Sequence, residues 1–244
     1  MNKHKIMKPK PYHEKILVSR KDDEIAILSM LKASLADGRN SMLSLLNVFR
    51  GIPISNNAEL FDVNDKYAEF RTNPLQILAI QSASEAIIRI VSCNKTIIGK
   101  LNYLDDARNI VSLKEFSFAD VHVDKRTSVR VQLQPPIGII LDVDGNRISG
   151  DIWDISLDGC NLTTVASSIL RQAHSIILNL KFMYNDSIRE VGIPARVLRV
   201  HEGFPSNCII LFEHTSVTEN TLSCFLHQRQ VEIIRELKRN MLKS

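Results

Sequence analysis

The second half of this sequence contains a series of short β-like runs separated by turn residues, and this series most constrains the fold. Asp144-Gly145-Asn146 is a tight-turn signal between the first two runs. The runs cover residues 131–141 (interrupted by Pro135-Pro136), 147–155, 160–164, 175–183, 189–200 and 207–213. Six strands separated by turns predict a small antiparallel barrel, which closes its own edges.

The first half mixes helical and β-like segments. Residues 22–36 are predicted as a helix that ends at Asp37-Gly38. Its apolar residues are expected to share one face: Ile25, Leu28, Leu31 and Leu35. A second short helix is predicted over 41–49, and a brief helix or turn over 74–84. Five β-like runs accompany them, at residues 59–64, 66–72, 85–92, 96–104 and 110–118. We therefore expect a small β-rich domain, a split barrel, over residues 22–119.

The two ends of the chain differ in composition. Residues 1–21 hold seven Lys/Arg against Glu14 alone, a net charge of +6, and are predicted to form a basic, disordered tail. Contact of this tail with lipid or nucleic acid is the alternative.

At the other end, Ser216-x-x-Glu219 is a capping box that predicts a C-terminal helix over 217–244. Its apolar residues follow at helical spacing: Leu222, Phe225, Leu226, Ile233, Ile234, Leu237 and Met241. Packing on its own barrel is the favoured role of this helix. Contact with a second copy, a homodimer, is the alternative, and Arg229-Gln230 interrupts the apolar stripe either way.

A basic motif lies where the two predicted domains join, in a junction over residues 120–130. Residues 125–130 read Lys-Arg-Thr-Ser-Val-Arg and place Arg126 and Arg130 four residues apart beside Lys125. Arginine forks hold phosphate oxygens or the O6/N7 edge of guanine.

A second motif, Asp-x-Ser-x-x-Gly, is formed by Asp154, Ser156 and Gly159 at the end of a predicted strand. A carboxylate accepts the N–H donors of guanine, and glycine lets a backbone come close. Trp153 lies beside this motif as a possible base-stacking residue, although a half-buried strand aromatic is the plainer interpretation. Taken together, the two motifs suit a ligand that carries both phosphates and purine edges.

In this order, and between β-like runs, the motifs resemble the signature of PilZ domains, which bind cyclic di-GMP. The resemblance spans residues 123–216, with the barrel itself expected over 131–216. It implies these ligand-binding residues: Lys125, Arg126, Arg130, Asp154, Ser156 and Gly159. Many members begin the first motif with two arginines, and Lys125 here replaces one, which leaves open whether one or two ligand copies bind. Residues 22–119 resemble, in layout only, the N-terminal domain of flagellar-brake (YcgR-type) proteins.

Each motif also has a plain structural interpretation. The arginines alone would be surface charges with weak salt bridges. The Asp-x-Ser-x-x-Gly motif alone would be a strand-ending turn held by side-chain-to-backbone bonds. Their joint occurrence on one predicted barrel favours ligand binding.

Other classes of chemistry are not supported. The seven histidines show no metal-ligand spacing, no phosphate-binding loop is present, and no enzyme signature is found. The four cysteines are predicted to be buried free thiols. No apolar run is long enough to span a bilayer, and no secretory signal is present, so we expect a cytoplasmic protein. Outside residues 1–21 the net charge is negative, which argues against a nucleic-acid partner.

The resemblance implies a cyclic di-GMP receptor, not an enzyme, that changes its interdomain arrangement on binding and regulates motility or exopolysaccharide and biofilm output through a protein partner. Such a partner would be a component of a flagellar motor or of polysaccharide synthesis. Two alternatives remain: a PilZ-like scaffold that binds no nucleotide, and a cyclic di-GMP-gated DNA-binding regulator.

Overall fold

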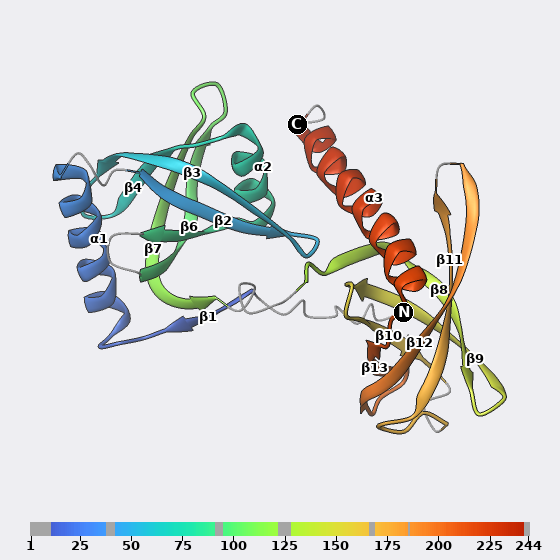
Figure 1. Cartoon of the computed structure of the whole chain (residues 1–244). Coiled ribbons are helices and arrows are strands. Elements are labelled where there is room, and N and C mark those ends of the chain that lie inside the picture. Colours follow the sequence, from blue (N-terminus) through green and yellow to red (C-terminus); the bar gives the residue numbers. More distant parts are fainter. Residues whose placement is uncertain are drawn as a thin grey trace. The chain divides into compact units, whose positions relative to one another are not determined.

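The computed structural model describes residues 11–37, 42–90, 95–121, 128–165, 169–184 and 186–241. The chain forms two compact units: residues 1–49, 53–126 and 237–244 belong to the first, and residues 50–52 and 127–236 belong to the second. Both units are mainly β (Figure 1).

The first unit is a closed sheet with two helices. Its elements are β1 (Tyr12–Lys15), α1 (Arg20–Ala36), β2 (Met42–Phe49), β3 (Ile52–Val63), β4 (Tyr67–Arg71), α2 (Pro74–Ala83), β5 (Glu85–Ile90), β6 (Lys95–Asp105) and β7 (Ile110–Val121). The strand order is β1-β7-β4-β3-β2-β5-β6, and an additional β7–β6 pairing closes six of the strands into a ring. The expected β-rich barrel is thus confirmed.

Local signals set both helices of this unit. Ser19 caps α1 by accepting a hydrogen bond from the backbone of Asp22, and Asn73 caps α2 in the same way, with Pro74 following it. α2 ends at Ser84, which adopts a left-handed conformation. The helix predicted over 22–36 is confirmed, but its face is rotated: Ile27 and Leu31 are fully buried, whereas Ile25 is 53% exposed.

Two expectations for this unit are wrong. Residues 42–49 form a strand, not a short helix, because they pair with β5, with Leu45 opposite Ile88. Local pattern cannot separate a short buried strand from a helix; the partner strand decides. The predicted disordered tail is also wrong for residues 11–21, since β1 pairs antiparallel with β7 and α1 begins at Arg20. Residues 1–10 lie outside the described residues.

The second unit is a closed six-stranded antiparallel barrel followed by a helix, as predicted. Its elements are β8 (Val131–Val143), β9 (Asn146–Ile155), β10 (Gly159–Thr164), β11 (Ser175–Tyr184), β12 (Ser187–His201), β13 (Ser206–Phe212) and α3 (Ser216–Met241). The ring order is β10-β13-β12-β11-β8-β9. Asp144 and Gly145 both have positive φ in the β8–β9 turn, as the sequence signal predicts. Pro135-Pro136 does not end β8 but falls in a register shift against β9.

α3 packs on this barrel through its first half. Phe225 is 2% exposed, and its ring centroid lies 4.7 Å from that of Phe182 on β11. The helix starts one residue earlier than the predicted box: Thr215 and Thr218 each accept a hydrogen bond from the other's backbone N–H. Cys224 is exposed, contrary to expectation, whereas Cys160 and Cys208 are buried free thiols; Cys93 lies outside the described residues. None of the described helices has the length and apolar character needed to cross a membrane.

Candidate functional site

The structure describes five of the seven predicted site residues, all of them in the second unit: Arg130, Trp153, Asp154, Ser156 and Gly159. Lys125 and Arg126 lie outside the described residues. Arg130 immediately precedes β8, Trp153 and Asp154 lie on β9, Ser156 lies in the turn after it, and Gly159 begins β10.

A bulge in β9 turns two successive side chains to the outer face of the barrel. Ile152 and Ile155 are both fully buried in the interior, so two residues separate them where strict alternation allows one. The β10–β9 register shifts at this point. Trp153 and Asp154 therefore both face outward, side by side.

Arg130 and Asp154 bring the two motifs together. β8 pairs with β9 so that its first residue, Val131, lies opposite Ile155, the last residue of β9. Arg130, which precedes Val131, therefore lies at the end of β9 that carries Asp154. Its Nη1 lies 3.7 Å from Oδ1 of Asp154, a loose ion pair. The Asp154 carboxylate also accepts a hydrogen bond from Asn161 Nδ2 at 3.4 Å. A cation and a half-buried carboxylate thus stand together on the barrel surface.

Ser156 and Gly159 shape the turn that carries the second motif. Ser156 is 3% exposed, and both its hydroxyl and its backbone N–H donate to the carbonyl of Gly159, at 3.2 and 2.8 Å. At Gly159, a Cβ atom would lie 2.1 Å from the carbonyl oxygen of Ile210. Glycine is therefore needed for the close approach of β10 to β13. Direct ligand contact by either residue stays a prediction.

Three further contacts hold the same turn. Phe212 N–H donates to the carbonyl of Asp158 at 2.9 Å, and the carboxylate of Asp158 accepts a hydrogen bond from the hydroxyl of Ser128. The ring of His214 bonds the carbonyl of Leu157. The turn is consequently tied to β13 and to the segment that carries Arg130.

Trp153 is held in a defined orientation. Its indole N–H donates to Thr163 Oγ1 across the strand pair at 2.9 Å, and 38% of the residue remains exposed. An anchored, partly exposed indole can stack on a flat ring. Thr163 also lines a cavity of about 560 Å³ over β8–β11, whose lining includes Gly138, Asp151 and Asn179 but none of the predicted site residues.

Strand register adds residues that sequence reasoning missed. A row on the outer face runs across five strands, from Gln132 on β8 through Asp154, Asn161 and Ile209 to Arg199 on β12. Arg199 is exposed and lies three strand spacings from Asp154, on the order of 14 Å. No local motif surrounds this arginine. Only the successive pairings of β9 with β10, β10 with β13 and β13 with β12 relate it to the site.

Beneath this surface the chemistry is inert. Burial raises the pKa of the Cys160 thiol well above its ordinary value; the charge of Asp154 acts in the same direction, and Arg130 opposes it. The thiol therefore stays protonated and is a poor nucleophile. Within the described ranges, no three His, Cys, Asp or Glu residues gather as metal ligands.

No family model and no curated protein matches this sequence. Several solved structures have similar folds. The inhibitor of motility MotI/DgrA of Bacillus subtilis has 13% identity and a TM-score of 0.40, with 79% of this chain and 97% of that chain covered. YcgR of Escherichia coli in complex with c-di-GMP has 13% identity and a TM-score of 0.39, covering 88% and 94%. The MrkH–c-di-GMP complex of K. pneumonia has 18% identity and a TM-score of 0.40, covering 87% and 96%.

Proposed function

We propose that this chain is a PilZ-type receptor that binds cyclic di-GMP on the outer face of its second barrel. The observation that carries the proposal is the approach of Arg130 to Asp154, 3.7 Å apart, which joins the two motifs on one surface. Arg-x-x-x-Arg and Asp-x-Ser-x-x-Gly are individually common, but here the β8–β9 pairing brings a residue of each motif to one barrel face.

The charges of this surface suit a ligand with two phosphates and two guanines. The Arg130 side chain is 45% exposed, and its ion pair with Asp154 is long, so a phosphate can compete for the guanidinium at little cost. Asp154 can then accept guanine N–H donors. Trp153 offers a ring for stacking beside it. Lys125 and Arg126 supply the further positive charge that the first motif predicts.

Arg199 extends the same surface in the opposite direction. It is the cation at the far end of the row that starts at Gln132 and contains Asp154. Arg130 and Arg199 are thus two cations with the Asp154 carboxylate between them. This order of charges fits a ligand whose phosphates flank its bases. We assign Arg199 a supporting role, through charge, in holding the ligand.

The receptor acts without turnover. Lys125 and Arg126 belong to the junction between the two units, so capturing them on the second barrel changes the arrangement of the units. A ligand shifts such an equilibrium only by its preference for one arrangement. Here that preference comes from junction cations that reach the phosphates in one arrangement only. The output in motility or exopolysaccharide synthesis, and the protein partner that reads it, remain predictions from the resemblance.

Titration calorimetry of the full chain with cyclic di-GMP tests the proposal. We expect binding with a Kd in the micromolar range or tighter, about −8 kcal/mol or better. The matched control is Asp154→Ala, which removes the carboxylate from the outer face. Folded wild-type protein that gives no heat and no thermal shift with excess ligand would contradict the proposal and favour a scaffold that binds no nucleotide.

A further inference from the structure

A second notable surface lies in the first unit, where β1 leads into α1. Three consecutive aliphatic residues there, Ile16, Leu17 and Val18, are 54%, 53% and 78% exposed. Ile25, in the second turn of α1, is 53% exposed as well. Single exposed aliphatic residues are common on protein surfaces, but three in succession form a concentrated apolar projection.

The backbone of this projection is held in place. The carboxylate of Asp23, which is only 4% exposed, accepts hydrogen bonds from the backbone N–H groups of Leu17 (2.8 Å) and Val18 (3.2 Å). The N-cap contact of Ser19 with Asp22 follows immediately. A loop that folded its aliphatic side chains inward would lose these bonds, so the exposed arrangement is the one that the local contacts stabilise.

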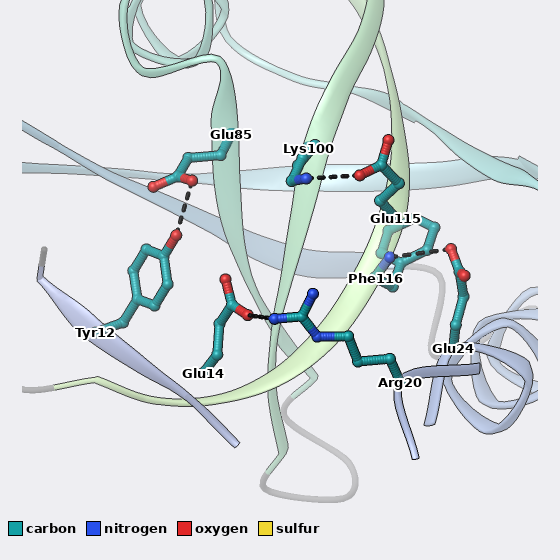
Figure 2. A network of polar contacts seen from close by, with 8 residues as sticks. All are labelled: Tyr12, Glu14, Arg20, Glu24, Glu85, Lys100, Glu115 and Phe116. Carbon is teal, nitrogen blue, oxygen red and sulfur yellow. Dashed lines mark hydrogen bonds and ion pairs between the residues drawn. The ribbon is translucent and has the colours of Figure 1, made fainter. Parts of the chain in front are cut away.

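Elements on both sides fasten the loop to the sheet (Figure 2). Before it, β1 pairs with β7, and the buried Tyr12 donates its hydroxyl to Glu85 at 2.7 Å. After it, Glu24 accepts a hydrogen bond from the backbone N–H of Phe116 at 3.2 Å. Glu14 and Arg20 also face one another across the loop, 3.7 Å apart. A projection ordered in advance loses little conformational entropy on binding.

Basic residues accompany the projection. Seven of the first 21 residues are basic, namely Lys3, Lys5, Lys8, Lys10, Lys15, Arg20 and Lys21, against one acidic residue. Lys15 and Lys21 are exposed on either side of the aliphatic run. Acidic residues lie nearby as well: Glu14 faces Arg20 at 3.7 Å, and Asp22, Asp23 and Glu24 follow at the start of α1. Residues 1–25 nevertheless carry seven basic and four acidic side chains, a net charge of +3.

This combination favours a lipid surface over a protein partner. A specific protein interface buries about 1,200–2,000 Å² in total, which a run of three aliphatic side chains cannot supply. A bilayer interface accepts a small apolar projection, and anionic headgroups attract nearby Lys and Arg. We propose that Ile16, Leu17 and Val18 insert shallowly into an anionic lipid surface, to which the net positive charge of residues 1–25 draws the first unit.

Cosedimentation of the full chain with vesicles tests this proposal. We expect binding to phosphatidylcholine vesicles that contain phosphatidylglycerol, and none to phosphatidylcholine alone. The triple variant Ile16→Ser/Leu17→Ser/Val18→Ser should bind roughly tenfold more weakly or worse, because it loses three apolar side chains. Its thermal stability should be unchanged, since these side chains are exposed. Ile188→Ser, at a position 64% exposed on β12, is the matched control and should bind as the wild type does.

A second measurement tests insertion directly. Trp153 is the chain's single tryptophan, so the wild type serves as the control for a Leu17→Trp variant. Brominated lipids should quench the added tryptophan and leave the wild-type fluorescence unchanged. Absence of wild-type binding to the anionic vesicles would overturn the proposal. Equal binding of the serine variant, or vesicle binding of Leu17→Trp without quenching, would also overturn it, because electrostatic attraction would then account for the contact.

Discussion

Asp154 lies between a cation and an amide on the outer face of the second barrel. Arg130 approaches one of its oxygens, and Asn161 donates to the other. In the absence of a ligand these contacts contribute little stability, since an ion pair at 3.7 Å with a 45% exposed guanidinium is worth under about 1 kcal/mol. The same groups gain far more when they bind a phosphate or a base edge, because charge-assisted bonds are the strong ones.

Substitutions of the cations should weaken ligand binding unequally. Arg130→Ala and Arg126→Ala each remove charge-assisted bonds worth roughly 1.5–3 kcal/mol, so affinity for cyclic di-GMP should fall by about ten- to a hundredfold. Lys125→Ala should cost less, because an ammonium lacks the planar fork. Calorimetric titration measures each change. Arg147→Ala, which removes an exposed cation paired with Asp142, is the control and should leave binding unchanged. A larger loss from Lys125→Ala than from either arginine variant would show that the site is wrongly assigned.

Gly159 belongs to the Asp-x-Ser-x-x-Gly motif and also occupies a position where the backbone of β13 leaves no room for a side chain. Gly159→Ala places a methyl group 2.1 Å from the carbonyl oxygen of Ile210, which forces β10 away from β13. The expected loss is roughly 2 kcal/mol or more of unfolding free energy, measured by urea denaturation. Gly138→Ala is the matched strand control, because its nearest atom would be 3.8 Å away, and it should change stability by less than about 0.5 kcal/mol. Equal stability of the two variants would mean that β10 and β13 can separate at no cost.

At the scale of elements, α3 and the β9 bulge serve different purposes. The bulge turns Trp153 and Asp154 to the same side, which forms the surface proposed for the ligand. The first half of α3 covers the barrel through Phe225, which confirms the expectation that the helix packs on its own barrel. A second copy is therefore not needed to bury this part of the helix.

Truncating Phe225 should destabilise the second unit. Phe225→Ala leaves a cavity against Phe182 and should cost about 3–5 kcal/mol. Because Trp153 is the single tryptophan, its fluorescence during urea denaturation reports on this barrel. Val217→Ala, at a position 71% exposed near the start of the same helix, should have almost no effect. A Phe225→Ala variant as stable as wild type would indicate that the helix contributes nothing to the barrel.

At the scale of the whole molecule, Lys125 and Arg126 fall in the sequence between the strands of two closed barrels. Binding should therefore change the arrangement of the units without changing either fold. Small-angle scattering with and without cyclic di-GMP measures this change, and Arg126→Ala is the control that should show a smaller effect. Identical profiles at saturating ligand, with binding confirmed by calorimetry, would mean that the units do not move and that the output comes from the ligand-covered surface itself.

The sequence by itself determined the features that depend on near neighbours in the chain. The Asp144-Gly145 turn, the start of α2 at Asn73-Pro74 and the six strand segments of the second barrel follow from backbone preferences and capping bonds within a few residues. Arg130 does lie beside Asp154, and ligand binding by the two motifs stays a prediction.

Only the tertiary structure decided what depends on distant partners. Residues 42–49 became a strand because β5 pairs with them, and Tyr12–Lys15 was ordered by β7, about a hundred residues later. Strand register likewise placed Arg199 in the row with Asp154. A strand satisfies its backbone hydrogen bonds on another segment, so its partner and register cannot be read from its own residues, whereas a turn or a helix cap forms within them.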